Sequence, residues 1–170
     1  MKKTAILLTT ICVSALLYVS CSNDNNEPTI TTDLTTIGAS VAVDTSNEMD
    51  LNTSLLISTT TSTTGKTTET PPPGICATIT ISTPNGGEYP KVFLADFGTA
   101  GCKDANNLTR KGQLKVTLSG AITATGSKMT IERINYSING LKLEGTIEYT
   151  NTTTTPTMPQ WTRKVTNGKL

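Results

Sequence analysis

The chain has 170 residues, with 14 Lys and Arg, 13 Asp and Glu, and no histidine. The missing histidine excludes Ser-His-Asp and Cys-His nucleophilic sites, and metal sites that need an imidazole ligand. The near-zero net charge argues against electrostatic binding of nucleic acid or of a membrane surface, and the length allows one domain.

Residues 1–20 have the features of a bacterial signal peptide. Lys2 and Lys3 precede the apolar run AILLTTICVSALLYV, which is too short to span a bilayer core of ~30 Å. The run ends in Ser20-Cys21, which resembles the lipobox of bacterial lipoproteins. The resemblance implies cleavage before Cys21 and attachment of a diacylglycerol to its thiol. The alternative is an ordinary secretory peptide with an incidental cysteine.

Cleavage would remove two lysines and no acid, so the mature net charge would be −1. SNDNNE (22–27) resembles the export signal that sends some Bacteroidota lipoproteins to the cell surface, and the alternative is a solvated tether. The sequence thus predicts a lipid anchor in the outer membrane, with the protein on the cell surface or the periplasmic face. It predicts no nucleic-acid partner, no cofactor and no metal.

Two segments precede the region with regular patterning. Residues 21–57 are polar with scattered apolar clusters, which fit one or two short strands or a weak helix, and we expect this segment to be partly ordered. Residues 58–74, STTTSTTGKTTETPPPG, are rich in Thr and Pro and predict an extended, disordered linker.

Residues 75–170 predict an antiparallel β module, so the fold class is all-β, with a small sheet or a sandwich-like arrangement. Apolar and polar residues alternate with period two in ICATITIS, KVFLADF, QLKVTLSGAIT, SKMTIERINYSI, LKLEGTIEYT and QWTRKVT. In SKMTIERINYSI this alternation places Ile134, Tyr136 and Ile138 on one face. Asn139-Gly140 between two strands is the strongest short hairpin signal.

Asn167-Gly168 repeats that hairpin signal, yet only two residues follow it. We therefore expect either a truncated member of a longer design or a last strand whose edge is left open. An open edge can pair with another chain.

Cys76 and Cys102 remain after Cys12 leaves with the signal peptide and Cys21 is lipidated. An even remainder in an oxidising compartment predicts a disulfide, and the alternative is two free thiols. In the chain-entropy model a disulfide that closes a loop of this size stabilises the fold by about 3.5 kcal/mol.

The segments VFLADFGTAGCKDANNLTRKGQLKVTLSG and INYSINGLKLEGTIEYTN resemble a family of uncharacterised Bacteroidota lipoproteins. The shared pattern is DFGxxGCxD, then RKG, then NYxINGxKxEGT, over about 75 residues. No activity is established for this family, so the resemblance implies a location in the cell envelope and an architecture. Its members usually continue beyond this point, which agrees with the expectation of truncation.

Two small groups of polar residues are candidate ligand sites. Asp104 and Asn106 offer oxygen ligands suited to calcium, and the alternative is an Asx-rich turn. Arg110 and Lys111 form a candidate site for a small anion, and the alternative is that they lie on a turn and pair with Asp96 or Asp104.

Three aromatic residues, Tyr136, Tyr149 and Trp161, would form a sugar-stacking platform if they shared a face. The alternative is that they belong to the core or to cross-strand pairs.

The sequence shows no set of residues that converges on a catalytic site, and two function hypotheses follow. The first is a non-catalytic binding or structural module of the envelope, with a glycan or an envelope protein as partner. The second is a carboxylate-only glycoside hydrolase that would bring Glu132, Glu144 or an Asp together. Glu144 and Glu148 on one strand face lie roughly 13 Å apart, too far for either glycosidase geometry. A third interpretation is a truncated fragment of a longer lipoprotein.

Overall fold

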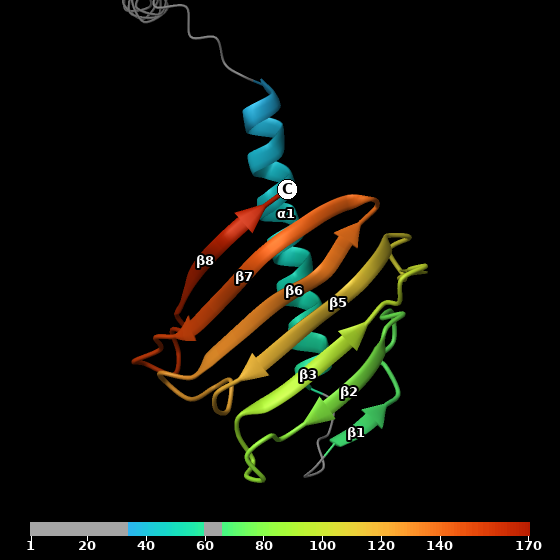
Figure 1. Ribbon diagram of the computed structural model, residues 1–170. Coiled ribbons are helices and arrows are strands. Elements are labelled where there is room, and N and C mark those ends of the chain that lie inside the picture. The colour runs from blue at the N-terminus through green and yellow to red at the C-terminus, as the bar shows by residue number, and fades with distance from the viewer. Residues whose placement is uncertain (1–33, 60–65) are drawn as a thin grey trace, which may run out of the picture. The chain divides into compact units, whose positions relative to one another are not determined.

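The computed structural model describes residues 34–59 and 66–170, which form one helix and an antiparallel sheet (Figure 1). The elements are α1 (Leu34–Ser58), β1 (Lys66–Glu69), β2 (Thr78–Ser82), β3 (Lys91–Asp96), β4 (Cys102–Lys103), β5 (Thr109–Leu118), β6 (Lys128–Ile138), β7 (Leu141–Asn151) and β8 (Trp161–Lys169). The predicted signal peptide, lipidation at Cys21 and export signal at 22–27 lie outside the described residues.

The sheet confirms the predicted antiparallel module. Its strand order is β1-β2-β3-β5-β6-β7-β8, with β4 pairing to β5, and every neighbouring pair is antiparallel. The second layer is α1 and not a second sheet, so the sandwich-like alternative is wrong. No described segment covers the opposite face of the sheet (Figure 1).

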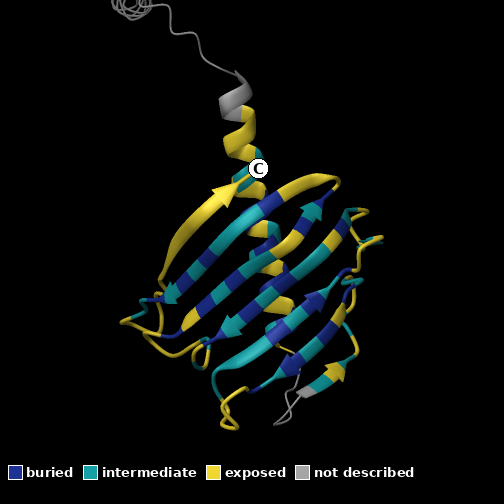
Figure 2. Ribbon diagram, in the orientation of Figure 1, coloured by how far each residue is buried: buried dark blue, intermediate teal, exposed yellow. Residues whose placement is uncertain are grey.

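The strands form where apolar residues alternate because one face of the sheet packs against α1 and the other meets water. Figure 2 shows this as buried and half-buried residues alternating along β2, β3, β5, β6 and β7. The strand residues on the helix side that are fully enclosed are Ile79, Ile81, Phe93, Ala95, Leu114, Val116, Ile131, Tyr136 and Ile147. These residues form the hydrophobic core, together with Ile57 from the helix.

The helix α1 occupies most of the segment that the sequence left open between strands and a weak helix. The side of α1 against the sheet is unusually polar, since Asn47, Asp50 and Ser54 are buried there at helical spacing with Ile57. The Ser54 hydroxyl donates to the Asp50 carbonyl at 2.6 Å, and Ser46 and Thr53 bond the helix backbone in the same way. These bonds let hydroxyl groups be buried without a partner on the sheet.

The predicted linker is partly structured. Residues 66–69 form the edge strand β1, which pairs with β2 from Lys66↔Ser82 to Glu69↔Ile79. Residues 60–65 lie outside the described residues, and the proline run follows β1 without regular structure.

A bulge in β6 decides which of its side chains face the helix. The pairing of β6 with β7 moves from Glu132↔Thr146 to Tyr136↔Leu143, so β6 has one extra residue there. Asn135 adopts the left-handed conformation at this point, with φ of 47°. The prediction that Ile134 shares a face with Tyr136 is therefore wrong: Ile134 is 37% exposed and Tyr136 is fully buried.

The hairpin signals had different outcomes. Asn139-Gly140 joins β6 to β7 with positive φ at both residues, as a type I′ turn requires. Asn167-Gly168, in contrast, lies within β8, where the register with β7 shifts between Glu144 and Thr146. Here the motif forms a bulge and no turn.

The predicted disulfide is confirmed, with the Cα atoms of Cys76 and Cys102 5.9 Å apart. It joins the segment before β2 to β4, beside the start of β5. Among the described residues, no helix combines the length and the hydropathy that crossing a membrane would require.

Candidate functional site

A buried group of charged residues joins the middle of α1 to the sheet. Asp50 has no exposed surface, and Nε and Nη2 of Arg133 contact its Oδ2 at 2.8 and 2.7 Å. The same guanidinium donates to Oδ1 of Asn47 at 2.9 Å. The Arg133 side chain is only 2% exposed, so this ion pair holds the helix on the sheet in a water-poor environment.

A second guanidinium completes this group. The Tyr136 hydroxyl donates to Oδ1 of Asp50 at 2.8 Å, and Nη1 of Arg110 lies 3.4 Å from the same oxygen. Nε of Arg110 donates to Oδ2 of Asp104 at 3.0 Å, and its guanidinium carbon lies 5.7 Å from the ring centre of Phe97. Two buried cations therefore face two buried carboxylates.

The electrostatics agree with a protonated Tyr136 hydroxyl that donates a hydrogen bond to Asp50. Burial raises the pKa of Tyr136 well above its ordinary value, and the negative charge of Asp50 adds to the rise. Burial also raises the pKa of Asp50, and the charge of Arg133 is the largest effect against that rise. The group is saturated by its own members, so it fits a structural role in holding α1.

A pocket of about 620 Å³ lies beside α1, where β6 begins and β7 ends. Its apolar lining comes from the helix, the β5–β6 loop, the sheet and the β7–β8 loop: Leu51, Leu55, Ile122, Met129, Tyr149, Pro156, Pro159 and Trp161. Thr and Asn side chains supply the rest of the wall, and no Lys, Arg, Asp or Glu lines it. Its volume falls within the ~300–1,000 Å³ typical of small-molecule sites.

The aromatic residues of this pocket come from paired strands. Asn151 in β7 pairs with Trp161 in β8, and Tyr149 lies two residues earlier on the same face as Asn151. Burial raises the pKa of Tyr149, the charge of Glu48 adds to the rise, and the guanidinium of Arg163 opposes it.

A smaller hollow, of about 300 Å³, lies where α1 meets the proline-containing segment and the β4–β5 region. Its lining includes Asp104, Asn106 and Arg110. The Asp104 carboxylate accepts from the backbone N–H groups of Asn106 and Leu108 and from Arg110. These bonds form an Asx-type turn with an ion pair, which is the alternative that the sequence offered for both groups.

The structure separates the remaining predicted site residues. Lys111 is exposed, whereas its neighbour Arg110 in β5 is buried. Of the three aromatic residues, Tyr149 and Trp161 line the pocket, and Tyr136 lies in the core beside Phe97, with ring centres 5.8 Å apart. Two of the three aromatic residues considered for a sugar-stacking platform, Tyr149 and Trp161, therefore lie together, and Tyr136 does not join them.

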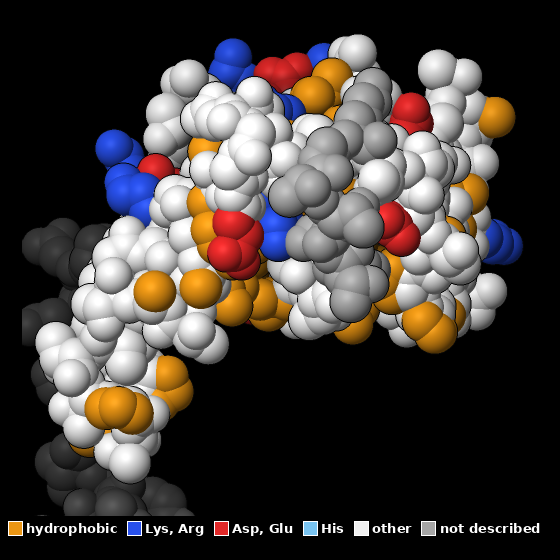
Figure 3. All heavy atoms as spheres, turned by 90° about the horizontal axis from the view of Figure 1, so that it is seen from below, with side chains coloured by type: hydrophobic (Ala, Val, Ile, Leu, Met, Phe, Trp, Pro, Cys, Tyr) orange, Lys and Arg blue, Asp and Glu red, His pale blue; other side chains and the backbone are white. Residues whose placement is uncertain are grey.

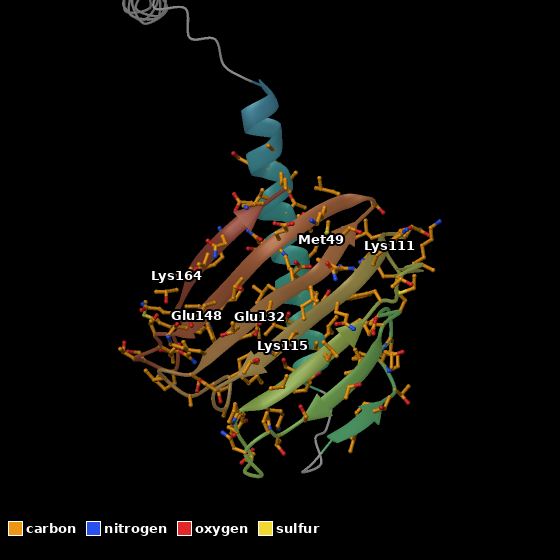
Figure 4. The ribbon with its side chains drawn as sticks, viewed as in Figure 1. Met49, Lys111, Lys115, Glu132, Glu148 and Lys164 are labelled. Carbon is orange, nitrogen blue, oxygen red and sulfur yellow. A yellow bond between two sulfur atoms is a disulfide. The ribbon has the colours of Figure 1, made fainter. Side chains whose placement is uncertain are left out.

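The glutamates of the hydrolase hypothesis lie on the side of the sheet away from α1. Glu132 accepts from Lys115 at 2.8 Å and Glu148 from Lys128 at 3.0 Å. Figure 4 shows Lys115, Glu132 and Glu148 on neighbouring strands.

Glu144 likewise bonds Lys142, and this hydrogen bond lowers the pKa of its carboxyl. A catalytic general acid needs the opposite shift. Acidic and basic side chains are also scattered among uncharged ones in the view of Figure 3, without a patch of one sign.

Comparison with known proteins gives no relative. No protein-family model matches the chain, and neither a curated protein nor a solved structure matches it significantly. The resemblance to Bacteroidota lipoproteins therefore stays a prediction.

Sequence reasoning missed Asp50, Arg133 and the helix wall of the pocket. A signal for the first was present, since Asn47, Asp50, Ser54 and Ile57 follow one another at spacings of helical period. A search for apolar periodicity misses this stripe because three of its four members are polar.

Proposed function

We propose that this protein is a non-catalytic binding module, anchored in the outer membrane through a lipid on Cys21, that binds a small molecule in the pocket beside α1. The observation that carries the proposal is the pocket itself, a large hollow lined without charged groups. Pockets with apolar walls and few polar groups are the usual form of a small-molecule site.

The chemistry of the surroundings supports binding without catalysis. Hydrolysis by carboxylates needs two acidic groups at one cleft. The pocket has no carboxylate in its wall, and Glu132, Glu144 and Glu148 are bonded to lysines on the other side of the sheet.

The anchor rests on the sequence around Ser20-Cys21. Its test is metabolic labelling with radioactive palmitate in cells that express the full chain. We expect label in the wild type and in Cys12→Ser, and none in Cys21→Ser. Equal labelling of Cys21→Ser and wild type would refute lipidation at this residue.

Binding is tested with a soluble form that begins at Ser22. This form keeps the unit Thr35–Leu170 with its core, its disulfide and its ion pairs. Trp161 is the sole tryptophan of the chain and lies in the pocket wall, so its emission reports on pocket occupancy. We expect a saturable emission change with at least one member of a set of neutral apolar, anionic and sugar compounds. No change with any of the three classes would refute the proposed function.

A further inference from the structure

The ligand class of the pocket can be derived from the side chains that line it, and this inference rests on the proposed function. We propose that the pocket binds an uncharged, largely apolar molecule of the kind of a long-chain alcohol or another neutral lipid, and that it rejects anions and free sugars. The argument has three parts: the charge of the wall, the state of its polar groups, and the position of its apolar side chains.

The wall offers no charge to an ionic ligand. No basic or acidic residue lines the pocket, so a carboxylate or phosphate that entered would lose hydration without gaining a counter-ion. The guanidinium of Arg163, which lies beside the lining residue Tyr149, bonds Asp44 at 3.0 Å and Glu48 at 3.5 Å. A fatty-acid headgroup would therefore have to compete with two carboxylates of α1.

Three polar side chains of the wall, those of Asn151, Thr125 and Thr153, already bond the protein. The Asn151 amide donates to the Ile122 carbonyl at 3.0 Å, and its Oδ1 accepts from the Thr153 N–H at 2.8 Å. The Thr125 hydroxyl donates to the Thr153 carbonyl at 2.6 Å, and Oγ1 of Thr153 accepts from the Gln160 N–H at 2.9 Å.

These bonds tie the β5–β6 loop to the β7–β8 loop and shape the mouth of the pocket. A sugar has many hydroxyl groups, and each one placed in the pocket without a partner costs free energy. The wall offers single hydroxyl groups among apolar side chains and no charged group to bind several sugar hydroxyls at once, so we expect free sugars to stay in water.

The apolar side chains surround the hollow on several sides. Met129 and Tyr149 form its sheet side and are nearly fully buried, and Leu55 on α1 is 38% exposed. Trp161 on β8 is 41% exposed, so part of its ring can be covered by a ligand. Covering these surfaces removes apolar area from water, which favours a hydrocarbon body.

The experiment compares decanol, decanoate and maltose by Trp161 emission, using the soluble form at neutral pH. Decanol and decanoate share a hydrocarbon chain and differ in headgroup charge. We expect saturable binding of decanol, at least roughly tenfold weaker binding of decanoate, and no change with maltose. Binding of maltose or decanoate as tight as that of decanol would overturn the ligand class and leave the proposed function standing. No binding of any of the three would overturn both.

Two neighbouring leucines of α1 provide matched variants. Leu55 lines the pocket, and Leu56 lies in the wall of the smaller hollow on the other side of the helix. Both are partly exposed, so substitution by glutamine should leave the fold intact. We expect Leu55→Gln to weaken decanol binding roughly tenfold and Leu56→Gln to leave it unchanged. Equal effects of the two variants would show that decanol does not bind in this pocket and would overturn the proposal.

Discussion

The two sides of α1 meet the sheet in opposite ways. On the side of Arg110 and Arg133, buried charges face one another and fill the space between helix and sheet. On the side of Leu51 and Leu55, apolar side chains surround a hollow of about 620 Å³ that the chain leaves open. The buried polar groups hold α1 rigidly on the sheet because each one has its hydrogen-bond or ion-pair partners. The uncovered apolar wall, in contrast, leaves room for a ligand.

The polar side fixes the helix, and the apolar side remains available. A helix whose buried stripe is polar has a weaker general tendency to pack on a sheet than one with an apolar stripe. Asp50 replaces that tendency with specific bonds to Arg133 and Tyr136. We infer that the position of α1, and with it the shape of the pocket, depends on this group of buried charges.

The largest expected effect comes from Arg133→Leu. The substitution leaves the buried Asp50 with Arg110 at 3.4 Å as its remaining cation, so we expect the free energy of unfolding to fall by about 4 kcal/mol. Urea denaturation measures this change. The control is Arg163→Leu, which also removes a bond from the sheet to α1, at an exposed site, where we expect a loss below about 1 kcal/mol. Similar losses in the two variants would contradict the special role of the buried pair.

The same variant has a predicted pH dependence. Arg133 is the largest effect that holds down the pKa of Asp50, so its removal raises that pKa further above the unfolded value. The folded state then binds more protons than the unfolded state between the two pKa values, and stability falls as the pH rises through this window. We expect the loss in Arg133→Leu to be greater at pH ~7 than at pH ~4, the lower end being the unfolded pKa of Asp. Urea titrations at the two pH values test the sign.

Loss of the disulfide should have the next largest effect on the free energy of unfolding, without changing the apolar pocket. Replacement of both Cys76 and Cys102 by serine opens a loop across a sequence separation of 26 residues. We expect a loss of about 3.5 kcal/mol, measured as a lower urea midpoint than that of the oxidised wild type. Reduction of the wild type should give the same shift. Decanol binding, normalised to the folded fraction, should stay unchanged because the disulfide does not line the apolar pocket.

A smaller effect is expected from Gly112→Ala at the bulge of β5 and β6. Gly112 has φ of 79°, and a Cβ there would lie 2.1 Å from the Asn135 carbonyl oxygen. Gly126 has a similar φ of 83° with nothing within 4 Å of its Cβ position, so Gly126→Ala measures the conformational cost alone. We expect a loss of about 1 kcal/mol for Gly126→Ala and about 2–3 kcal/mol for Gly112→Ala. Thermal unfolding of both variants gives the difference, and equal losses would argue against a close approach at the bulge.

The smallest effect should come from the apolar side. Leu55→Gln removes a partly exposed side chain from a wall that faces the hollow, so we expect the free energy of unfolding to change by less than about 0.5 kcal/mol. The same variant should lose most of its decanol binding. A loss of stability as large as that of Arg133→Leu would show that this side also holds the helix.

Much of the sheet could be predicted from the sequence, because strand patterning is a local property. The buried sets Ala77, Ile79 and Ile81 and Leu114, Val116 and Leu118 agree with the alternation, and Asn139-Gly140 forms the predicted hairpin. A half-buried strand must alternate with period two, and a type I′ turn needs two residues that tolerate positive φ.

The side chains that matter most for the candidate site could not be predicted in this way. Alternation with period two places Arg133 and Tyr136 on opposite faces of β6. Both nevertheless reach Asp50 because β6 has an extra residue between them. A bulge reverses the alternation beyond it, and its position depends on the pairing with both neighbouring strands.

The sequence by itself determined the antiparallel strands, the β6–β7 hairpin and the pairing of Cys76 with Cys102, because each depends on local pattern or on the number of cysteines left to pair. Only the tertiary structure decided that residues 34–58 form a helix across one face of the sheet, and that Tyr149 and Trp161 share a pocket with Leu55. These features depend on contacts between segments that lie far apart in the chain. The free energy of such contacts comes from burial and charge pairing, which a local pattern does not contain.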